Sequence, residues 1–238
     1  MTFDDFVQSC VSDCVNGPEQ ARSFTVVECE QRSEAWHRVR AGLVTGTCAD
    51  PMLANPRKGQ KESVQRRDLR IAKALEIITE QPQEDGFVSR EMQRGREKES
   101  AALDAYQIAT GRLVYTCGFV KHNTLRIGCS PDGYVGDFEG LVSLKCPKSA
   151  THLEYLRERT IPTEYVRQLT HEAFVTEAQW ADFVSFDDRM PEPLQLLVIR
   201  VTRDQLALKE YELALRIFLK EIDDEVAAIR ALQEGVAA

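Results

Sequence analysis

Three residues along the chain carry reactive side chains at positions where such side chains need a specific environment. Glu99 has Ala102, Leu103 and Tyr106 as helical neighbours, so its carboxylate borders an apolar stripe. Asp132 occupies a Pro-Asp-Gly turn, and Lys145 follows thirteen positions later inside an apolar strand-like run. A carboxylate that faces inward is unusual unless it is paired or coordinates a metal. The order of helix Glu, turn Asp and strand Lys therefore indicates a candidate site.

Each of these residues also has a purely structural explanation. Aspartate is common in turns because its side chain caps the local backbone. Lys145 can extend to solvent from the end of a strand. Glu99 can lie at the margin of the apolar stripe and pair with Lys98 or Arg96. The residues alone leave both explanations open.

Apolar periodicity predicts the elements that position these side chains. Helices are expected from Ser33 onward and over 63–79, 89–110, 150–159, 162–176 and 204–234. Strands are expected near Phe24 and over 113–120, 125–129, 141–146, 180–186 and 194–201. This order predicts an α/β protein with a mixed sheet flanked by helices.

Composition restricts the class of protein. A chain of 238 residues with 43% hydrophobic and 29% charged residues is typical of one globular domain, and we expect a cytoplasmic protein without a membrane segment. The net charge of −8 argues against nucleic-acid binding over the whole surface but permits a local basic channel. The basic run 56–73 is either such a feature or a solvated helix face. The seven cysteines suggest neither a zinc site nor a disulfide framework, and a pair at Cys10 and Cys14 is too small for one.

Asp132-Gly133 together with the run 141–147 (LVSLKCP) resembles the PD-(D/E)xK nuclease core in the form used by the lambda exonuclease, or YqaJ-like viral recombinase, family. In that family the strand ends in E-x-K-C-P. Further segments resemble its other motifs: 34–47 its W-H-x-x-R-x-G-x-(I/V)-T-x-S motif, 95–99 and 106–111 its G-x-x-x-E helix, 165–168 its glutamine-bearing helix, and 186–190 its D-x-R-M segment. Together these segments span most of the chain.

The resemblance implies a restriction-endonuclease-like core within a single exonuclease domain over 1–238. The core would occupy about 89–201, after an N-terminal helical part over 1–88 and before a C-terminal helix over 204–235. The implied activity is magnesium-dependent 5′-to-3′ hydrolysis of double-stranded DNA to 5′-mononucleotides in phage-type recombination, with Mn²⁺ as a possible substitute for Mg²⁺. The implied partners are DNA ends, a single-strand annealing protein and two further copies of the chain in a trimeric ring, in the cytoplasm of a bacterial host.

The same resemblance assigns roles to individual residues. Glu99, Asp132 and the backbone carbonyl of Leu144 would bind the metal, because hard cations take oxygen ligands. Lys145 would orient the attacking water or stabilise the reacting phosphate. Gln168 would position the water or a neighbouring phosphate.

A second group of residues would bind the DNA end. Arg40 and Thr47 would hold the 5′ phosphate, because guanidinium groups and hydroxyls suit its oxygens. Trp36 and His37 adjoin them in the same motif and are candidate DNA-binding residues.

Ser143 departs from the family pattern, which has a glutamate at this metal-binding and catalytic position. A hydroxyl is a much poorer magnesium ligand than a carboxylate. Three explanations remain: an engineered substitution, a natural variant that works through water, or a carboxylate elsewhere, such as Glu139 or Glu172, that replaces the missing one.

Two other functions follow if these assignments fail. The chain is then a DNA-end-binding form of the same fold, inactivated by Ser143, or an interaction protein in which Asp132 and Lys145 are structural. The first predicts no magnesium-dependent release of nucleotides. The second predicts that Asp132→Ala and Lys145→Ala affect no DNA assay.

Overall fold

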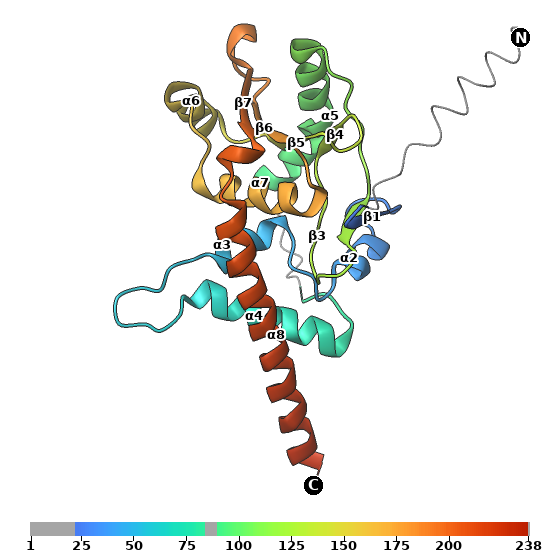
Figure 1. Ribbon diagram of the computed structural model, residues 1–238. Coiled ribbons are helices and arrows are strands. Elements are labelled where there is room, and N and C mark those ends of the chain that lie inside the picture. Colours follow the sequence, from blue (N-terminus) through green and yellow to red (C-terminus); the bar gives the residue numbers. More distant parts are fainter. Residues whose placement is uncertain (1–21, 84–89, 238) are drawn as a thin grey trace, which may run out of the picture.

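The computed structural model describes residues 22–83 and 90–237 (Figure 1). The strands in these ranges are β1 (Phe24–Val27), β2 (Phe119–His122), β3 (Gly128–Cys129), β4 (Gly133–Val135), β5 (Gly140–Lys145), β6 (Trp180–Phe186) and β7 (Leu196–Thr202). The helices are α2 (Glu34–Arg40), α3 (Ala49–Met52), α4 (Val64–Thr79), α5 (Arg90–Thr110), α6 (Ser149–Glu158), α7 (Thr163–Thr176) and α8 (Leu208–Ala237). Short 3-10 helices are η1 (Gly46–Cys48), η2 (Glu192–Leu194) and η3 (Arg203–Gln205).

The larger sheet has the strand order β4-β5-β6-β7. Its outer pairs are antiparallel and its central pair, β5 with β6, is parallel, with Ser143 opposite Phe183 and Lys145 opposite Ser185. A parallel pair requires a crossover connection, and α6 and α7 provide it. A smaller antiparallel sheet has the order β1-β2-β3, and its Val120 and Cys129 share a core cluster with Leu141 of the larger sheet. The predicted mixed sheet flanked by helices is therefore confirmed.

The two faces of β5 meet different helices. Val142 and Leu144 pack with Ala102 and Tyr106 of α5, whereas Leu141 belongs to the core that includes α7. Side chains alternate along a strand, so Ser143 and Lys145 share the α7 side with Leu141. This alternation decides which helix can contribute to the site.

Helix starts agree with the predictions where a capping residue is present. Ser33 and Ser63 cap α2 and α4, and each side chain accepts a hydrogen bond from the backbone N–H three residues later. The predicted start of α5 at Ser89, the segment 84–89 and the pair of Cys10 and Cys14 lie outside the described residues.

The strands predicted over 113–120 and 125–129 are largely wrong. Only β2 and β3 form there, because β1 offers β2 a partner just over Phe24–Val27. Leu113 and Tyr115 are exposed, so their apolar character does not mark a buried face. The final helix begins at Leu208 and not at 204, since Thr202 and Gln205 form a capping box around η3.

The basic run 56–73 does not present its arginines as a free face. Arg66 and Arg70 of α4 pair with Glu62, and they also reach Glu221 and Glu225 of α8, which crosses α4 in Figure 1. These ion pairs fasten two helices together. The structural explanation for this part of the run is therefore the better one.

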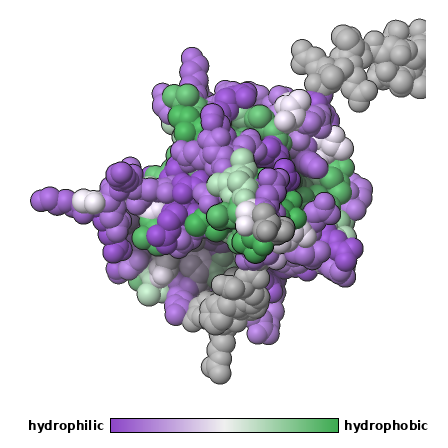
Figure 2. All heavy atoms as spheres, turned by 90° about the horizontal axis from the view of Figure 1, so that it is seen from below, coloured by the Kyte–Doolittle hydropathy of each residue, from purple (hydrophilic) through white to green (hydrophobic). Residues whose placement is uncertain are grey.

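The surface seen from below is mostly hydrophilic, with green patches of limited size (Figure 2). Within the two described ranges, no helix has both the length and the apolar content that crossing a membrane requires. The cysteines described there, Cys29, Cys48, Cys117, Cys129 and Cys146, are all free thiols.

Candidate active site

Asp132 and Lys145 meet at the end of β5. The Asp132 carboxylate accepts a hydrogen bond of 2.7 Å from the backbone N–H of Leu144, and its same oxygen lies 4.0 Å from the Lys145 Nζ. Both side chains are largely shielded, at 25% and 19% exposure. A turn residue and a strand residue that are separated by thirteen positions thus form one ion pair.

The local sequence explains why Lys145 stays in this place. It is the last residue of β5, and Pro147 follows closely; because proline cannot donate a hydrogen bond to a neighbouring strand, the strand ends directly after Lys145. The Nζ also lies 5.0 Å from the ring centroid of Tyr165 in α7. Asp132 and Tyr165 therefore hold the lysine, which does not extend freely into solvent.

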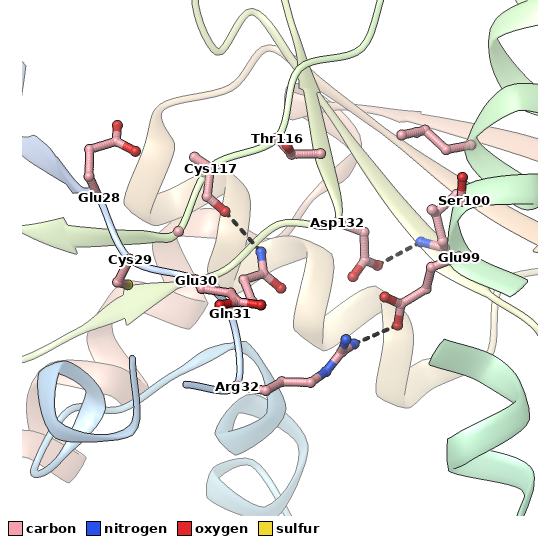
Figure 3. A pocket seen from close by; sticks show the side chains of 13 residues that line it. Glu28, Cys29, Glu30, Gln31, Arg32, Glu99, Ser100, Thr116, Cys117 and Asp132 are labelled. Carbon is pink, nitrogen blue, oxygen red and sulfur yellow. Dashed lines mark hydrogen bonds and ion pairs between the residues drawn. The ribbon is translucent and has the colours of Figure 1, made fainter. Parts of the chain in front are cut away.

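Glu99 lies across a pocket from Asp132. The pocket has a volume of about 520 Å³, and Glu99, Asp132 and Leu144 are among the residues that line it. Figure 3 shows the carboxylates of Glu99 and Asp132 pointing toward one another. Glu99 pairs with Arg32 at 2.5 Å and not with Lys98 or Arg96. Glu99 is half-exposed, so it lies at the margin of the apolar stripe and not on its buried face.

Leu144 contributes its backbone to the site. Its amide N–H donates to Asp132, and the expected role of its carbonyl as a metal ligand stays a prediction. Its side chain is buried against α5. Ser143 is only 2% exposed and lies on the opposite, α7 side of the strand.

Gln168 and Glu172 of α7 form a second polar pair. Gln168 Nε2 donates to Glu172 Oε1 at 2.8 Å. The Glu172 carboxylate is 2% exposed, and its Oε2 has no hydrogen-bond partner among the described residues. Burial, together with the charge of Asp132, raises the pKa of Glu172 to about 7, although the hydrogen bond from Gln168 and the charge of Lys145 act to lower it. Gln168 thus contacts a carboxylate that belongs to the same electrostatic environment as Asp132 and Lys145.

The predicted DNA-end residues also come together. The Arg40 guanidinium lies 3.7 Å from the ring centroid of Trp36, and it donates to Thr45 Oγ1, which in turn is 3.5 Å from Thr47 Oγ1. The ring of His37 packs edge-on against Trp36 at 4.9 Å. This cluster presents a cation and hydroxyl groups, which suit an anionic ligand.

One hydrogen bond ties this cluster to the carboxylate site. Trp36 Nε1 donates to Ser130 Oγ at 2.7 Å, and Ser130 accompanies Asp132 in the same loop. The link positions α2 beside the loop that carries Asp132. Sequence motifs placed both groups in the chain, but their adjacency is a result of the fold.

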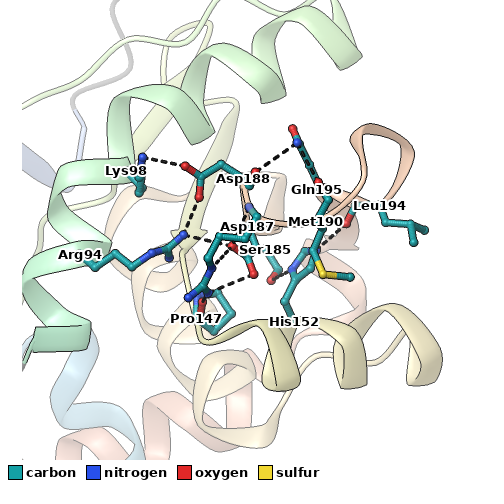
Figure 4. A network of polar contacts seen from close by, with 11 residues as sticks. Arg94, Lys98, Pro147, His152, Ser185, Asp187, Asp188, Met190, Leu194 and Gln195 are labelled. Carbon is teal, nitrogen blue, oxygen red and sulfur yellow. Dashed lines mark hydrogen bonds and ion pairs between the residues drawn. The ribbon is translucent and has the colours of Figure 1, made fainter.

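A network at the end of β6 positions the elements around the site (Figure 4). Asp187 is fully buried and accepts from Arg94 of α5 at 3.0 Å and from Arg189 at 2.7 Å. Arg94 also pairs with Asp188, and Arg189 donates to the carbonyl of Pro147. Burial would raise the pKa of Asp187, but hydrogen bonds from Arg189 and its charge hold that pKa far below its usual range. The network fastens α5 to the ends of β5 and β6, a role that the sequence did not reveal.

The donor set fits a hard divalent cation with few protein ligands. Within the described part of the chain, no three His, Cys, Asp or Glu side chains converge closely enough to hold a metal ion. Two carboxylates border the pocket, and Glu172 has a buried oxygen without a partner. Magnesium is usually bound through one or two carboxylates and keeps several waters. Asp132 and Glu99 would therefore suit Mg²⁺, which would keep several waters.

Comparisons with known proteins agree with this geometry. A sequence model described as "YqaJ-like viral recombinase domain" matches residues 35–179, which is more than half of the chain. The alkaline exonuclease LHK-Exo from Laribacter hongkongensis is 31% identical with a TM-score of 0.76, over 86% of this chain and 100% of that chain, and its complex with dAMP gives the same values. No curated protein matches significantly.

A more distant structure shares the fold. The phage-related exonuclease from Haemophilus somnus 129PT is 14% identical with a TM-score of 0.62, over 80% of this chain and 96% of that chain. At this identity the similarity concerns the fold alone.

Proposed function

The chain belongs to the YqaJ-like viral recombinase family, and we propose that it is a magnesium-dependent exonuclease that degrades double-stranded DNA from the 5′ end and releases 5′-mononucleotides. The observation that carries this proposal is that Glu99 and Asp132 border one pocket while Asp132 also pairs with Lys145, next to the loop to which the Arg40 cluster is tied through Trp36. The similarity to an alkaline exonuclease that has been crystallised with dAMP supports a DNA-hydrolysing activity.

The proposed chemistry uses a bound Mg²⁺ to polarise the scissile phosphate and to lower the pKa of an attacking water. Asp132 and Glu99 would supply carboxylate oxygens for that ion. Lys145, held by Asp132, brings a positive charge to the reacting phosphate, where negative charge develops in the transition state. Mn²⁺, which accepts the same oxygen ligands, is expected to substitute for Mg²⁺.

The Arg40 cluster would select the end of the DNA. A guanidinium group stacked on an indole ring is fixed in orientation and can form paired hydrogen bonds with a phosphate. Thr47 is exposed and offers a hydroxyl to the same ligand. Because Trp36 is tied to the Asp132 loop, a 5′ phosphate bound here would place the adjacent nucleotide near the carboxylates.

The assembly and partners belong to the same proposal. We expect a homotrimeric ring around DNA in the cytoplasm of a bacterial host, acting with a single-strand annealing protein in phage-type recombination. Family membership supports this expectation. The net charge of −8 is compatible with it only if the basic groups concentrate along the DNA path.

A second candidate function is a DNA-end-binding protein without hydrolysis. The observation in its favour is Ser143, a neutral residue at the strand position that faces the same side as Lys145. The Arg40 cluster, which would bind the 5′ phosphate, would remain intact in such a protein. Only a catalytic assay separates the two functions.

The test is release of acid-soluble nucleotides from linear duplex DNA with 5′ phosphates, in Mg²⁺ and in EDTA. The chain is compared with Ser143→Glu and with Lys145→Met. We expect Mg²⁺-dependent release by the chain and loss of release in Lys145→Met. Release only by Ser143→Glu would establish the inactive end-binding form, and no release by either would refute the nuclease.

A further inference from the structure

Ser143 faces helix α7. Leu141, two residues earlier, packs in the same core cluster as Leu169 of α7, and Lys145, two residues later, lies over Tyr165 of α7. Ser143 lies between them on the same face of β5. A carboxylate that replaces the missing strand glutamate must therefore come from α7 or from the loop beside it.

Glu172 is the carboxylate that α7 presents on this side. It lies one helical turn after Leu169, which packs in the same cluster as Leu141 of β5, and on the helix whose Tyr165 contacts Lys145. One carboxylate oxygen is fixed by Gln168, while the other is buried without a partner among the described residues. A buried carboxylate oxygen without a donor is costly, and ligation of a cation is one way in which proteins satisfy it.

Glu172 packs closely against the segment that carries Thr45 and Thr47. A Cβ atom at Gly46 would lie 2.9 Å from Glu172 Oε1 and 3.2 Å from Gln168 Cγ. The glycine thus allows the Thr45–Thr47 segment to approach α7 closely. Glu172 therefore adjoins the proposed phosphate-binding segment, on the helix that also holds Tyr165 against Lys145.

Other carboxylates do not fit the role. Glu139 precedes the first residue of β5, so it lies at the opposite end of the strand from Lys145, roughly 13 Å from Ser143 at ~3.3 Å per residue. It is also exposed. Asp187 and Asp182 are each already paired with arginine. Of the two carboxylates that the sequence offered as replacements, Glu139 and Glu172, only Glu172 fits the position.

We propose that Glu172 is a metal ligand of this site, supplying from α7 the carboxylate that Ser143 does not provide from β5, with Gln168 as the residue that positions it. This inference rests on the proposed nuclease function. The ligand set would be Asp132 and Glu172 with waters and the Ser143 hydroxyl, and Glu99 at the pocket's outer side. This ligand set is compatible with the finding that no three carboxylates converge among the described residues, because Mg²⁺ can be held by two carboxylates and waters.

The test measures binding of Mn²⁺ alone to the full chain, by electron paramagnetic resonance of the free ion and by calorimetry, without DNA. Glu172→Gln is expected to weaken Mn²⁺ binding by about 10- to 100-fold, the usual effect of damage to a metal site. Glu139→Gln, the matched control, should bind as the unaltered chain does. Ser143→Glu combined with Glu172→Gln should regain most of the affinity, because the carboxylate returns from the strand.

A structural role for Glu172 predicts different results. If Glu172 only accepts from Gln168, then Glu172→Gln binds Mn²⁺ normally, and this overturns the proposal. No Mn²⁺ binding by the unaltered chain overturns it as well. Should Glu172→Gln fail to fold, Glu172→Asp keeps the charge but withdraws it by one methylene, and unchanged Mn²⁺ affinity in that variant is again a refutation.

The nuclease assay separates this inference from the proposed function. Mn²⁺ binding that depends on Glu172, together with no nucleotide release, removes the exonuclease function and leaves the metal site. Nucleotide release together with Mn²⁺ binding that is unchanged in Glu172→Gln keeps the exonuclease function and removes Glu172 as a metal ligand.

Discussion

Acid should loosen the fold through His171, a buried histidine of α7. Its Nε2 lies 2.9 Å from the carbonyl of Gly128 and its Nδ1 lies 2.5 Å from the hydroxyl of Tyr211. A carbonyl only accepts, so Nε2 carries the proton and Nδ1 accepts from Tyr211. The neutral imidazole thus joins α7 to β3 and α8.

The magnitude follows from the pKa. Burial lowers the pKa of His171 from its ordinary 6.5 to about 4. Above pH 6.5 both the folded and the unfolded states are neutral, and the stability is fully present. Between pH 6.5 and 4 only the unfolded state binds the proton, so the free energy of unfolding falls, by about 3 kcal/mol over the whole window at ~1.4 kcal/mol per pH unit.

The assay is urea unfolding at pH 7 and pH 4, followed by circular dichroism in EDTA, for the chain and for His171→Gln. Carboxylates titrate in both proteins and cancel in the difference. We expect the unaltered chain to lose about 3 kcal/mol more than the variant between these pH values. The imidazole proton resonance, followed by NMR in the unaltered chain, should titrate near pH 4. Equal losses, or a titration near pH 6.5, would refute the reasoning.

Three further predictions concern other parts of the molecule. Arg40→Ala should raise the KM for 5′-phosphorylated duplex ends about 10-fold or more and leave the KM for 5′-hydroxyl ends nearly unchanged, because a charge-assisted hydrogen bond is worth ~1.5–3 kcal/mol. Arg38→Ala is the control, since Arg38 pairs with Glu34 on its own helix. Equal effects of Arg40→Ala on both kinds of end would contradict the assignment. Gly140→Ala should lower the free energy of unfolding by about 1–3 kcal/mol in thermal or urea unfolding, since the new Cβ would lie 2.0 Å from the Trp180 ring; unchanged stability would show that the ring shifts freely. Asp187→Asn should cost about 1–3 kcal/mol by leaving two arginines without their shared carboxylate, and a variant as stable as the unaltered chain would show that the network is dispensable.

The candidate site shows how far residue patterns reach. The Pro-Asp-Gly turn and the strand ending at Lys145 were enough to nominate Asp132 and Lys145, and the structure places them 4.0 Å apart. Glu99 was nominated from the helical stripe, and it borders the same pocket. Its partner, Arg32, lies 67 residues away in sequence, and no local spacing indicates that pairing.

Predictions were weakest where burial was inferred from apolar composition alone. Strand patterns over 113–129 failed because hydrogen-bond partners, which are supplied by distant segments, decide where a strand forms. The basic run over 56–73 was ambiguous because, besides the local Glu62, the acidic residues that pair with Arg66 and Arg70 lie on α8, more than 150 residues further along the chain.

The sequence by itself determined the order of helices and strands around the site, the turn aspartate, the strand lysine and the absence of a glutamate at position 143. These depend on periodicity and on residue type, which are local properties. The tertiary structure alone decided that α7 and not the β4–β5 turn faces Ser143, that Glu172 is buried with an oxygen lacking a partner among the described residues, and that the Arg40 cluster adjoins the Asp132 loop. The reason is physical: burial and proximity are set by the packing of segments far apart in sequence, and they change the chemistry of a carboxylate without changing its identity.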